Sequence, residues 1–461
     1  MTAFFEELLF LVSIMYIVYL VVFATYSFLA VSVGAYVLFM RDRMLMLSNK
    51  LEHTYIPISI IVPAYNEEVT IVNSVKSLLQ IEYHLYEIIV VDDGSVDATS
   101  QAMIDEFDMR LISRPINLTL NCKPENAIYE KEINGVKITL INKQNGGKGD
   151  ALNMGINVCR FPYFICVDAD SKLQKDSLEK IIQPIMEDET VISVGGMIQL
   201  SQCVRWKNGN ISGHYFPRNW IVCMQAVEYD RSFLSSRILF DTFNGNLVIS
   251  GAFGIFEKAT AIAAGGYSVG NLGEDMELVL KLHVYCRNNN IKYRMRYEPT
   301  AICLTQAPTT LKDLIVQRRR WHLGLFQSMM KHRSIFFNTK FGKVGFLSYM
   351  YYLFYELLAP FIEFLGILFI ILASYMELLN YRFMIMLFAL YAVYGGILSL
   401  TSFSQHIYIN RFKLSFFDII KAMLLCVFEF GVFRHIFVVV RIMAFLKYQK
   451  NKMAWGKIKR V

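Results

Sequence analysis

Pairs of carboxylates follow two short apolar segments of the sequence. Asp168 and Asp170 come directly after residues 163–167, and Asp92 and Asp93 follow residues 87–91. Neighbouring carboxylates repel one another, so each pair favours a cation or hydrogen-bond donors nearby. Mg²⁺ and Mn²⁺ bind carboxylates together with phosphate oxygens, which predicts that Asp168 and Asp170 hold such an ion beside a diphosphate leaving group. A solvent-facing turn is the alternative for both pairs.

A glycine-rich segment, residues 146–150 (GGKGD), resembles a phosphate-binding loop. It is not a Walker A motif, because Asn142 replaces the first glycine of that motif and Gly149 replaces its Ser or Thr. A kinase or ATPase of that type is therefore excluded. Lys148 between glycines can still approach a diphosphate closely. The alternative is a loop that only opens the helix expected at 150–158.

Two later groups could also contribute to catalysis. Glu274 and Asp275 precede an amphipathic segment, where acidic residues favour a helix N-terminus, but a carboxylate there could also deprotonate an attacking hydroxyl. Residues 317–321 (QRRRW) place arginines, which suit a diphosphate, before a tryptophan that offers a stacking surface for a sugar ring. A lipid anchor beside a membrane is the alternative for this basic run.

The elements that must position these residues read as an α/β domain. Short apolar strands are expected at 58–62, 87–91, 136–142 and 163–167, with a helix at 67–80. This alternation predicts a mostly parallel sheet with helices on both faces, and ligands of such sheets bind beyond the carboxyl ends of the strands. Residues 109–135 interrupt the pattern, and no chemistry is assigned to them.

The composition points to a membrane protein. Of 461 residues, 54% are apolar and only 18% are charged, which excludes a disordered chain and disfavours a purely soluble one. The net charge of +7 gathers beside apolar runs, including Lys50 and the tail at 447–460, so anionic lipid rather than nucleic acid is the expected partner. The eight cysteines lack metal-site spacing and are expected to be reduced thiols.

Apolar runs at 8–40, 346–376, 383–403 and 416–446 are long enough to be considered as membrane segments. Arg41 and Arg43 after the first run place the N-terminus outside and the next domain in the cytoplasm. Three later single crossings would leave the basic tail outside. One of these three runs must therefore cross twice, re-enter or not cross at all. The last run is expected to divide near Gly431. Alternatively, residues 433–448 lie flat at the membrane interface. The predicted domains are 1–50, 51–335 and 336–461.

The motifs, in their order between apolar runs, resemble those of membrane-embedded processive glycosyltransferases of family 2. That family includes synthases of cellulose, mixed-linkage glucan, hyaluronan, chitin and poly-N-acetylglucosamine. The matching residues are Asp92-Asp93-Gly94, Asp168-x-Asp170, Glu274-Asp275 and Gln317-x-x-Arg320-Trp321. The resemblance implies a GT-A-like α/β cytoplasmic domain inserted between transmembrane helices, with interfacial amphipathic helices.

The resemblance also implies roles for individual residues. The donor side is expected to comprise residues facing the uridine (Tyr65, Glu67, Asp93), the diphosphate (Lys148, Arg320) and the metal (Asp170, with Asp168 nearby). The acceptor side is expected to comprise the general base Asp275 beside Glu274, the stacking Trp321, and Gln317, Ser250 and Gly251. Tyr65 and Glu67 follow the first strand, where a turn and a helix cap are the alternative reading.

The implied reaction is inverting transfer from a UDP-sugar with Mg²⁺ or Mn²⁺, giving a β-linked polysaccharide. The nascent polymer is expected to leave through a channel of C-terminal helices, with Glu356, Glu363, Glu429, Arg434 and Arg441 as candidates to line it. Segments 250–256 and 273–283 favour glucose, possible linkages being β-1,4 or mixed; the absence of an F-x-V-T-x-K gating segment weakens ordinary cellulose synthesis.

Alternatives remain open at this point. They are an amino-sugar polymer made from UDP-N-acetylglucosamine, a single transfer to a lipid acceptor, and a non-enzymatic membrane scaffold or transporter. The expected location is the inner cell membrane, with several crossings and the catalytic domain in the cytoplasm. The expected partners are the UDP-sugar, the nascent polysaccharide, membrane lipid and an accessory export protein, with no nucleic acid.

Overall fold

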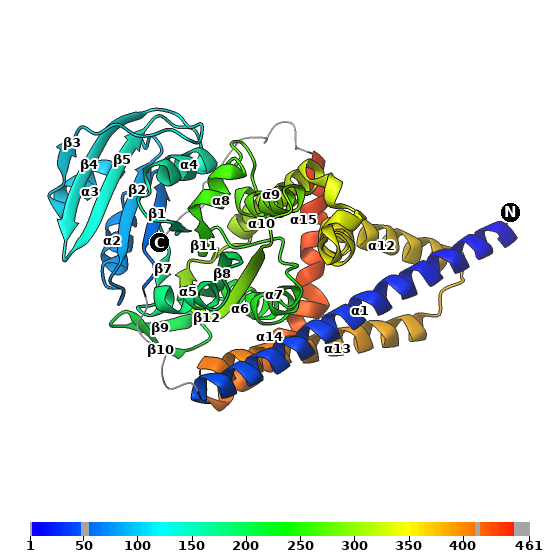
Figure 1. Ribbon diagram of the computed structural model, residues 1–461. Helices are drawn as coiled ribbons and strands as arrows, with labels where there is room; N and C mark the ends of the chain where they lie inside the picture. Colours follow the sequence, from blue (N-terminus) through cyan, green and yellow to red (C-terminus); the bar gives the residue numbers. More distant parts are fainter. Residues whose placement is uncertain (1, 48–54, 411–414, 447–461) are drawn as a thin grey trace.

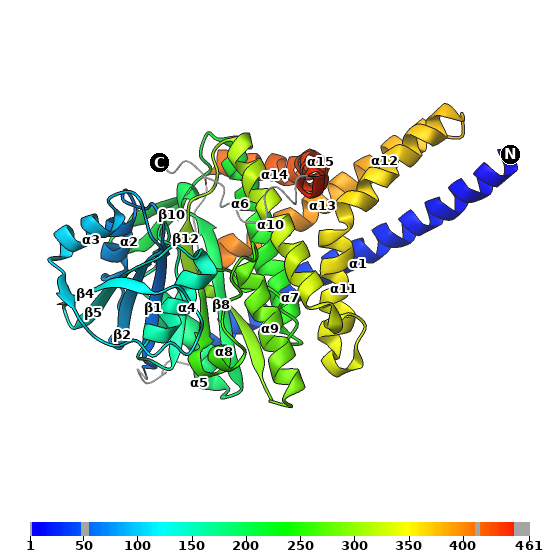
Figure 2. The same ribbon diagram turned by 90° about the horizontal axis from the view of Figure 1, so that it is seen from above.

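A mixed β-sheet flanked by helices forms one part of the molecule, and long helices extend from it (Figures 1 and 2). The computed structural model describes residues 2–47, 55–410 and 415–446. Lys50, the basic tail at 447–460 and the predicted domain boundary at 50/51 lie outside these ranges. The ten-stranded sheet has the order β3-β4-β5-β2-β1-β6-β11-β8-β12-β7.

The centre of the sheet is parallel, as predicted. It consists of β5 (Val136–Lys143), β2 (Tyr86–Asp92), β1 (Ile58–Ala64) and β6 (Tyr163–Cys166). The strands expected from apolar runs are all present, within two residues of their predicted ends. The carboxyl ends of these four strands lie at one edge, where the acidic and glycine-rich motifs follow.

The flanks of the sheet are largely antiparallel, so the whole sheet is mixed rather than mostly parallel. Residues 109–135 include β3 (Arg110–Ile112) and β4 (Glu125–Ile133), which extend one side antiparallel to β5. On the other side, β11 (Gly254–Glu257) runs against both β6 and β8 (Val191–Leu200), because it starts at the edge where its neighbours end. Strand β12 (Arg294–Thr305) is parallel to β8 and antiparallel to β7 (Lys172–Leu173). A separate hairpin joins β9 (Val204–Lys207) and β10 (Asn210–His214).

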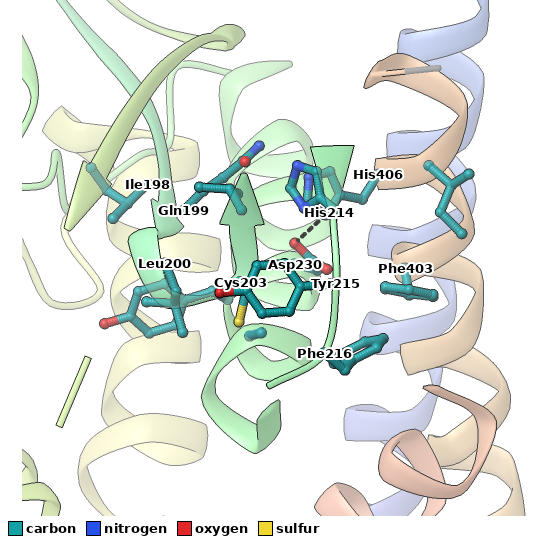
Figure 3. A pocket seen from close by; sticks show the side chains of 14 residues that line it. Ile198, Gln199, Leu200, Cys203, His214, Tyr215, Phe216, Asp230, Phe403 and His406 are labelled. Carbon is teal, nitrogen blue, oxygen red and sulfur yellow. Dashed lines mark ion pairs between the residues drawn. The ribbon is translucent and has the colours of Figure 1, made fainter. Parts of the chain in front are cut away.

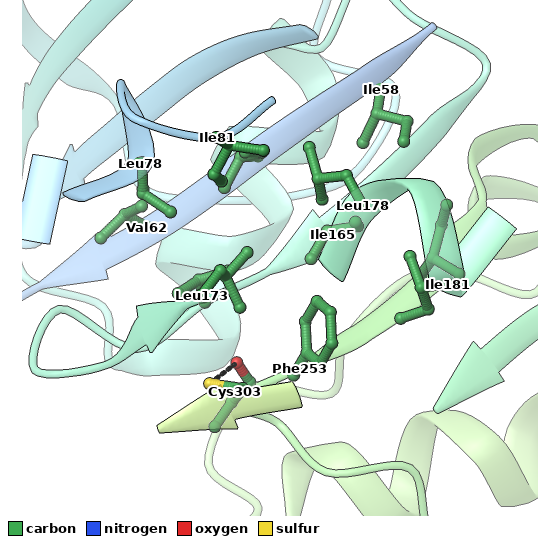
Figure 4. Packing of buried hydrophobic residues seen from close by; sticks show 14 of the residues in the cluster. Ile58, Val62, Leu78, Ile81, Ile165, Leu173, Leu178, Ile181, Phe253 and Cys303 are labelled. Carbon is green, nitrogen blue, oxygen red and sulfur yellow. Dashed lines mark hydrogen bonds between the residues drawn. The ribbon is translucent and has the colours of Figure 1, made fainter. Parts of the chain in front are cut away.

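Alternating apolar residues give the sheet two buried faces. In β1, Ile60 packs with the helices on one face, while Ile61 packs with those on the other. The first face is covered by α2 (Ile71–Leu78), α3 (Thr99–Phe107) and α5 (Ser177–Glu187); Figure 4 shows part of this core. The second face is covered by α4 (Lys148–Val158), α8 (Lys258–Ala263) and α9 (Glu274–Asn288).

Two described helices are long and apolar enough to cross a membrane, α1 (Thr2–Leu47) and α13 (Tyr381–Asn410). A third crossing results if residues Val344–Leu357 and α12 (Ala359–Tyr375), which are bent by 49°, are counted as one span. The segment before α12 contains α11 (Tyr349–Tyr351) between two π-helical stretches. Membrane helices therefore flank the sheet domain in the chain, as expected.

The last apolar run is divided where the sequence predicted. Helix α14 (Phe416–Phe428) and α15 (Arg434–Leu446) are separated by a π-helical turn, Glu429–Phe433, that contains Gly431. One face of α14 exposes large apolar side chains, including Phe416, Phe417 and Leu424. Helix α15 instead packs along α10 (Leu311–Lys331) and α12. The run is thus built as two short helices rather than one long one.

The two halves of α1 have different surroundings. Its first half exposes Phe10, Met15 and Val18, whereas Ala30 and Leu38 in its second half are buried. The buried half packs against α13, α7 (Arg237–Asp241) and the π-helical turn before α7. The first half is therefore suited to lipid, while the second packs on the protein along one side and exposes apolar side chains such as Phe28 and Tyr36 on another.

Polar contacts join the sheet domain to α13 through α6 (Trp220–Arg231). Asp230 pairs with His406 of α13 at 2.9 Å, beside a cavity of about 40 Å³ (Figure 3). Arg231 pairs at 2.9 Å with Glu429, which is buried. Glu429, predicted as a channel-lining candidate, therefore connects α6 to the turn between α14 and α15. The side chain of another candidate, Arg434, lies outside those described.

Candidate active site

Lys148 lies at the centre of an acidic cluster at the carboxyl edge of the sheet. Its ammonium nitrogen is 2.7 Å from a carboxylate oxygen of Asp168, which follows β6, and 3.5 Å from one of Glu274, the first residue of α9. Lys148 itself begins α4, and its side chain is almost buried. Three elements that are distant in the sequence thus meet here. They bring Lys148, predicted to contact the diphosphate, next to the motifs predicted to hold the metal and the general base.

The loop before β11 closes this cluster from another side. The Gly251 N–H donates a hydrogen bond to the Asp275 carboxylate at 3.2 Å. A Cβ on Gly251 would lie 3.3 Å from the Cβ of Asp275 and 3.5 Å from the nitrogen of Lys148. The backbone can approach both residues this closely because position 251 has no side chain. Gly251, predicted to be on the acceptor side, therefore lies within the same cluster, and Ser250, predicted with it, directly precedes it in the loop.

The charges in the cluster shift one another's pKa values. Burial and the neighbouring Asp168 carboxylate raise the pKa of Asp170 to about 6. Burial also raises the pKa of Glu274, although Lys148 opposes this shift. For Lys148, burial would lower the pKa, but the carboxylates of Asp168 and Glu274 raise it above the usual range. Strongly shifted groups in one place are typical of functional sites.

The carboxylate pair after β6 fits a divalent ion that is shared with a ligand. Asp168 and Asp170 are close enough for each carboxylate to disfavour ionisation of the other, and a shared cation would relieve this repulsion. Within the described ranges, no group of three or more His, Cys, Asp or Glu side chains is arranged to hold a metal. Two carboxylates would need further oxygen ligands, and phosphate oxygens are of the type that Mg²⁺ and Mn²⁺ accept.

Asp93 belongs to a second, closed cluster. Its carboxylate accepts hydrogen bonds from the backbone N–H groups of Gly146 and Gly147, at 3.0 and 2.7 Å, and from the Lys143 ammonium at 2.5 Å. Lys143 is fully buried and also pairs with Asp150 at 2.6 Å. Burial raises the pKa of Asp93 even though Lys143 and the two amides oppose the shift. Asp93 thus fixes the glycine loop that leads to Lys148; its predicted contact with uridine stays a prediction.

Tyr65 and Glu67 lie in the loop between β1 and α2. Tyr65 is exposed, while Glu67 is buried and accepts a hydrogen bond from the Thr70 hydroxyl at 2.6 Å. Side chains of the segment after β2 hold this loop, since Thr99 and Asp97 accept hydrogen bonds from the N–H groups of Glu67 and Glu68. These contacts explain why the helix begins at residue 71 rather than at 67. They also leave the Tyr65 ring available at the surface.

Helix α10 presents Gln317, Arg320 and Trp321 at helical spacing, which places them on one side of the helix. Arg320 lies close enough to oppose the upward pKa shifts of Asp170 and Glu274. Trp321 is 39% exposed, so its ring remains accessible. The Gln317 side-chain oxygen is buried and has no hydrogen-bond partner among the described residues. An acceptor oxygen in this state is suited to a ligand hydroxyl.

Paired glycines bring α10 against the start of α9. A Cβ on Gly324 would lie 2.6 Å from the Gly273 nitrogen, and one on Gly273 would lie 2.9 Å from the Gly324 carbonyl carbon. The Ser328 hydroxyl donates to the Gly273 carbonyl at 3.2 Å, and Gln327 accepts from the Leu272 N–H at 2.9 Å. The close packing places the tryptophan-bearing helix next to Glu274 and Asp275.

Three supporting groups were missed by the sequence analysis. They are the buried Lys143, the bidentate pair between Arg318 and Glu228 at 2.7 and 2.6 Å, and the buried Glu277, which contacts His332 and Lys331. Arg318 also lies over the Trp321 ring, 4.7 Å from its centroid, and so orients it. The QRRRW motif contained Arg318, but nothing in its spacing indicated a partner in α6.

The fold and the cluster together define a class of protein: a membrane-associated enzyme with a GT-A-like mixed sheet. Comparison with known families then identifies the family. Residues 163–439 match the sequence model of glycosyl transferase family group 2, and residues 59–121 match that of glycosyl transferase family 2. The chain therefore belongs to glycosyl transferase family group 2. The expectation of a hexosyltransferase is confirmed at the level of enzyme class.

Curated relatives share the central part of the chain. A poly-β-1,6-N-acetyl-D-glucosamine synthase of Staphylococcus aureus (strain COL) is 27% identical over 283 residues, covering 61% of this chain and 57% of that protein. The corresponding synthase of Staphylococcus epidermidis is 26% identical over 289 residues, covering 61% and 58%. The match thus spans less than two thirds of these relatives. A solved mannosyltransferase of Pyrobaculum calidifontis, in complex with GDP-Man and Mn²⁺, aligns with a TM-score of 0.49 and 18% identity over 85% of this chain and 99% of that one.

Proposed function

We propose that the protein is an inverting, processive glycosyltransferase that uses UDP-N-acetylglucosamine to extend a β-linked polysaccharide. The observation that carries the proposal is the convergence of Lys148, Asp168, Glu274 and Asp275 beside the tryptophan-bearing helix α10. The staphylococcal relatives are named as N-acetylglucosamine polymer synthases, which favours the amino sugar. The expectation of glucose rested on segments 250–256 and 273–283 and gains no support from these relatives.

On the donor side, the residues supply positive charge and orientation. Lys148 and Arg320 are proposed to contact the diphosphate, while Tyr65 lies beside the base and Asp93 and Glu67 hold the loops around it. Asp168 and Asp170 would hold Mg²⁺ or Mn²⁺, which supplies further neutralisation of the diphosphate when bound. Preorganised positive charge favours the departure of the nucleoside diphosphate, because negative charge builds up there in the transition state.

On the acceptor side, Asp275 is proposed to act as the general base. It takes the proton of the acceptor hydroxyl as that oxygen bonds to the anomeric carbon. The bond from this carbon to the diphosphate oxygen breaks, and its electron pair leaves with UDP, so one displacement inverts an α-linked donor to a β-linkage. Trp321 is proposed to stack on the terminal sugar, and the Gln317 oxygen to accept a sugar hydroxyl. Glu274 keeps Lys148 in place.

The arrangement of helices supports a multi-pass protein of the inner membrane with its sheet domain in the cytoplasm. We propose that α1 crosses inward, residues 344–375 cross outward, and α13 crosses back inward. The short helices α14 and α15 then stay on the cytoplasmic side, which places the basic tail where positive charge is favoured. The domains 1–50, 51–335 and 336–461, a channel near α12 and α13, and an accessory export protein remain part of this proposal.

The test uses the full chain purified in detergent with labelled UDP-N-acetylglucosamine or UDP-glucose, each with Mg²⁺ or Mn²⁺. We expect high-molecular-weight product from UDP-N-acetylglucosamine that a β-1,6-specific hexosaminidase degrades. We also expect Asp275→Asn to abolish it, while Asp105→Asn, an exposed carboxylate on α3, leaves it unchanged. Polymer from UDP-glucose alone would refute the amino sugar. A single sugar on a lipid would refute processivity, and UDP release that survives Asp275→Asn would refute the assigned base.

A further inference from the structure

A polar cleft lies at the edge of the sheet opposite the candidate active site. It has a volume of about 400 Å³ and is lined by residues just before β8, just before β12 and after α7. Strands β8 and β12 are parallel to each other, and both begin at this edge. The carboxyl-end motifs lie at the other edge, so the cleft is separate from the cluster around Lys148.

The charge of the cleft suits an anion. Lys292, Arg294 and Lys343 line it, and Asp188 is the only acidic residue among those that line it. Arg294 is 3.6 Å from Asp188, whereas Lys292 and Lys343 are exposed. Positive charge thus exceeds negative charge in a space large enough for a phosphorylated headgroup.

One wall of the cleft continues into the membrane-spanning segment. Lys343 directly precedes Val344, where the bent pair of candidate membrane helices begins. Just before it in the chain, Phe336 and Phe337 are exposed, and the Phe337 ring packs 4.9 Å from Phe346. Exposed aromatic side chains beside lysines are typical of chain that lies at the membrane surface.

The opposite wall reaches α1 through a chain of packed aromatic rings. Phe243 lines the cleft and packs 5.8 Å from Phe240, which in turn lies 5.9 Å from Tyr26 of α1. This wall of the cleft is therefore continuous with α1, a candidate membrane helix.

We propose that the cleft binds the phosphate headgroup of an anionic phospholipid from the cytoplasmic leaflet. Lys292, Lys343 and Arg294 contact the phosphate, and the acyl chains extend towards the candidate membrane segment that begins at Val344. The site ties the sheet domain to the bilayer at a point remote from the reaction. It does not depend on which sugar the enzyme transfers.

Native mass spectrometry of the full chain in a non-ionic detergent tests this site. The probes are dioctanoyl phosphatidylglycerol, dioctanoyl phosphatidylcholine and soluble glycerol 1-phosphate. We expect one phosphatidylglycerol molecule to bind at concentrations at which the other two do not. The double variant Lys292→Gln/Lys343→Gln should weaken this binding about thirtyfold. The matched control Lys76→Gln/Lys207→Gln, two exposed lysines on α2 and β9, should change it less than about twofold.

A change in the opposite direction provides a second arm. Asp188→Asn removes the acidic group from the cleft and should tighten phosphatidylglycerol binding. If the double variant melts at a lower temperature than the wild type, the single exposed variant Lys343→Gln decides the outcome, with an expected loss of about fivefold. Equal losses in the test and control doubles would overturn the site. Equal binding of phosphatidylcholine would overturn the charge assignment, and equal binding of glycerol 1-phosphate would indicate a soluble anion instead of lipid.

Discussion

Lys143 and Lys148 are five residues apart in the sequence, yet the carboxylates around them differ in how many backbone hydrogen bonds they accept. Lys143 pairs with Asp93 and Asp150, and two backbone amides also serve Asp93. Lys148 faces Asp168 and Glu274, with Asp170, Asp275 and Arg320 close by. The second cluster therefore holds four carboxylates and two cations. Carboxylates exceed cations in both clusters, but in the first cluster backbone N–H groups also donate to Asp93 and Asp150, which makes it a closed structural joint.

This difference indicates how one glycine loop serves two purposes. Asp93 anchors Gly146 and Gly147 through their N–H groups, and the next residue, Lys148, reaches Asp168 and Glu274. Buried charges that are fully paired contribute rigidity, whereas incompletely neutralised ones bind ligands. Substitutions in the two clusters should therefore separate stability from activity.

The largest effect is expected for Lys143→Met. It leaves Asp93 and Asp150 buried without their shared cation, which should cost about 3–5 kcal/mol of unfolding free energy. The thermal midpoint in detergent should fall by about 10 °C. Lys137→Met, on the same strand but more exposed, provides the control. An unchanged midpoint for Lys143→Met would mean that the cluster is not a structural joint.

Lys148→Met should lower the rate of the reaction while leaving the stability of the fold nearly unchanged. The rate of UDP release should fall about 10²–10³-fold, because a preorganised cation is lost at the diphosphate. The thermal midpoint should remain nearly unchanged, since the freed carboxylates can take up protons. Lys148→Arg, which keeps the charge, should recover part of the rate. Loss of stability without a specific loss of rate would contradict the contrast between the two clusters.

Glu277 extends the comparison to a third cluster, on α9. Although burial opposes the shift, His332, Lys281 and Lys331 lower the pKa of Glu277 to about 2. A carboxylate whose pKa is lowered on folding stabilises the fold at pH values above its ordinary pKa of 4.5. This stabilisation is lost as the pH falls towards 2. Glu277→Gln should therefore cost about 3 kcal/mol at pH 7, and the deficit should narrow below about pH 4.5.

Melting curves of the wild type and Glu277→Gln between pH 7 and pH 3 test whether the stability deficit of the variant narrows on acidification. Glu132→Gln, an exposed residue of β4, serves as the control and should follow the wild type throughout. A deficit that widens on acidification would show that Glu277 is not ionised in the folded protein.

The smallest effect is expected for Gly251→Ala. The added Cβ would meet Asp275 at 3.3 Å and Lys148 at 3.5 Å, so both must move by a few tenths of an ångström. The turnover rate should fall about tenfold, with little change in the thermal midpoint, because catalysis depends more steeply on geometry than folding does. Gly213→Ala, where a Cβ meets only the Arg205 side chain at 3.9 Å, should leave the rate intact. Equal turnover rates for the two variants would mean that residue 251 is not part of the active site.

The parallel centre of the sheet could be predicted because each strand is an apolar run that ends in polar residues. The same rule anticipated that Asp168 and Lys148 lie at one edge, and the structure confirms that they meet. The direction of β11 could not be predicted, because it depends on where a long connection returns to the sheet. The role of Lys143 was also hidden: a lysine before a turn is ordinarily exposed, and only the fold shows that Asp93 and Asp150 surround it.

Helix α1 continues without a break from Thr2 to Leu47, a length of about 70 Å. That is more than twice the thickness of a hydrocarbon core, so a bilayer around the first half of α1 would leave the second half outside the hydrocarbon, where it packs along α7 and α13. The same helix would then serve both as a membrane segment and as a support for the sheet domain.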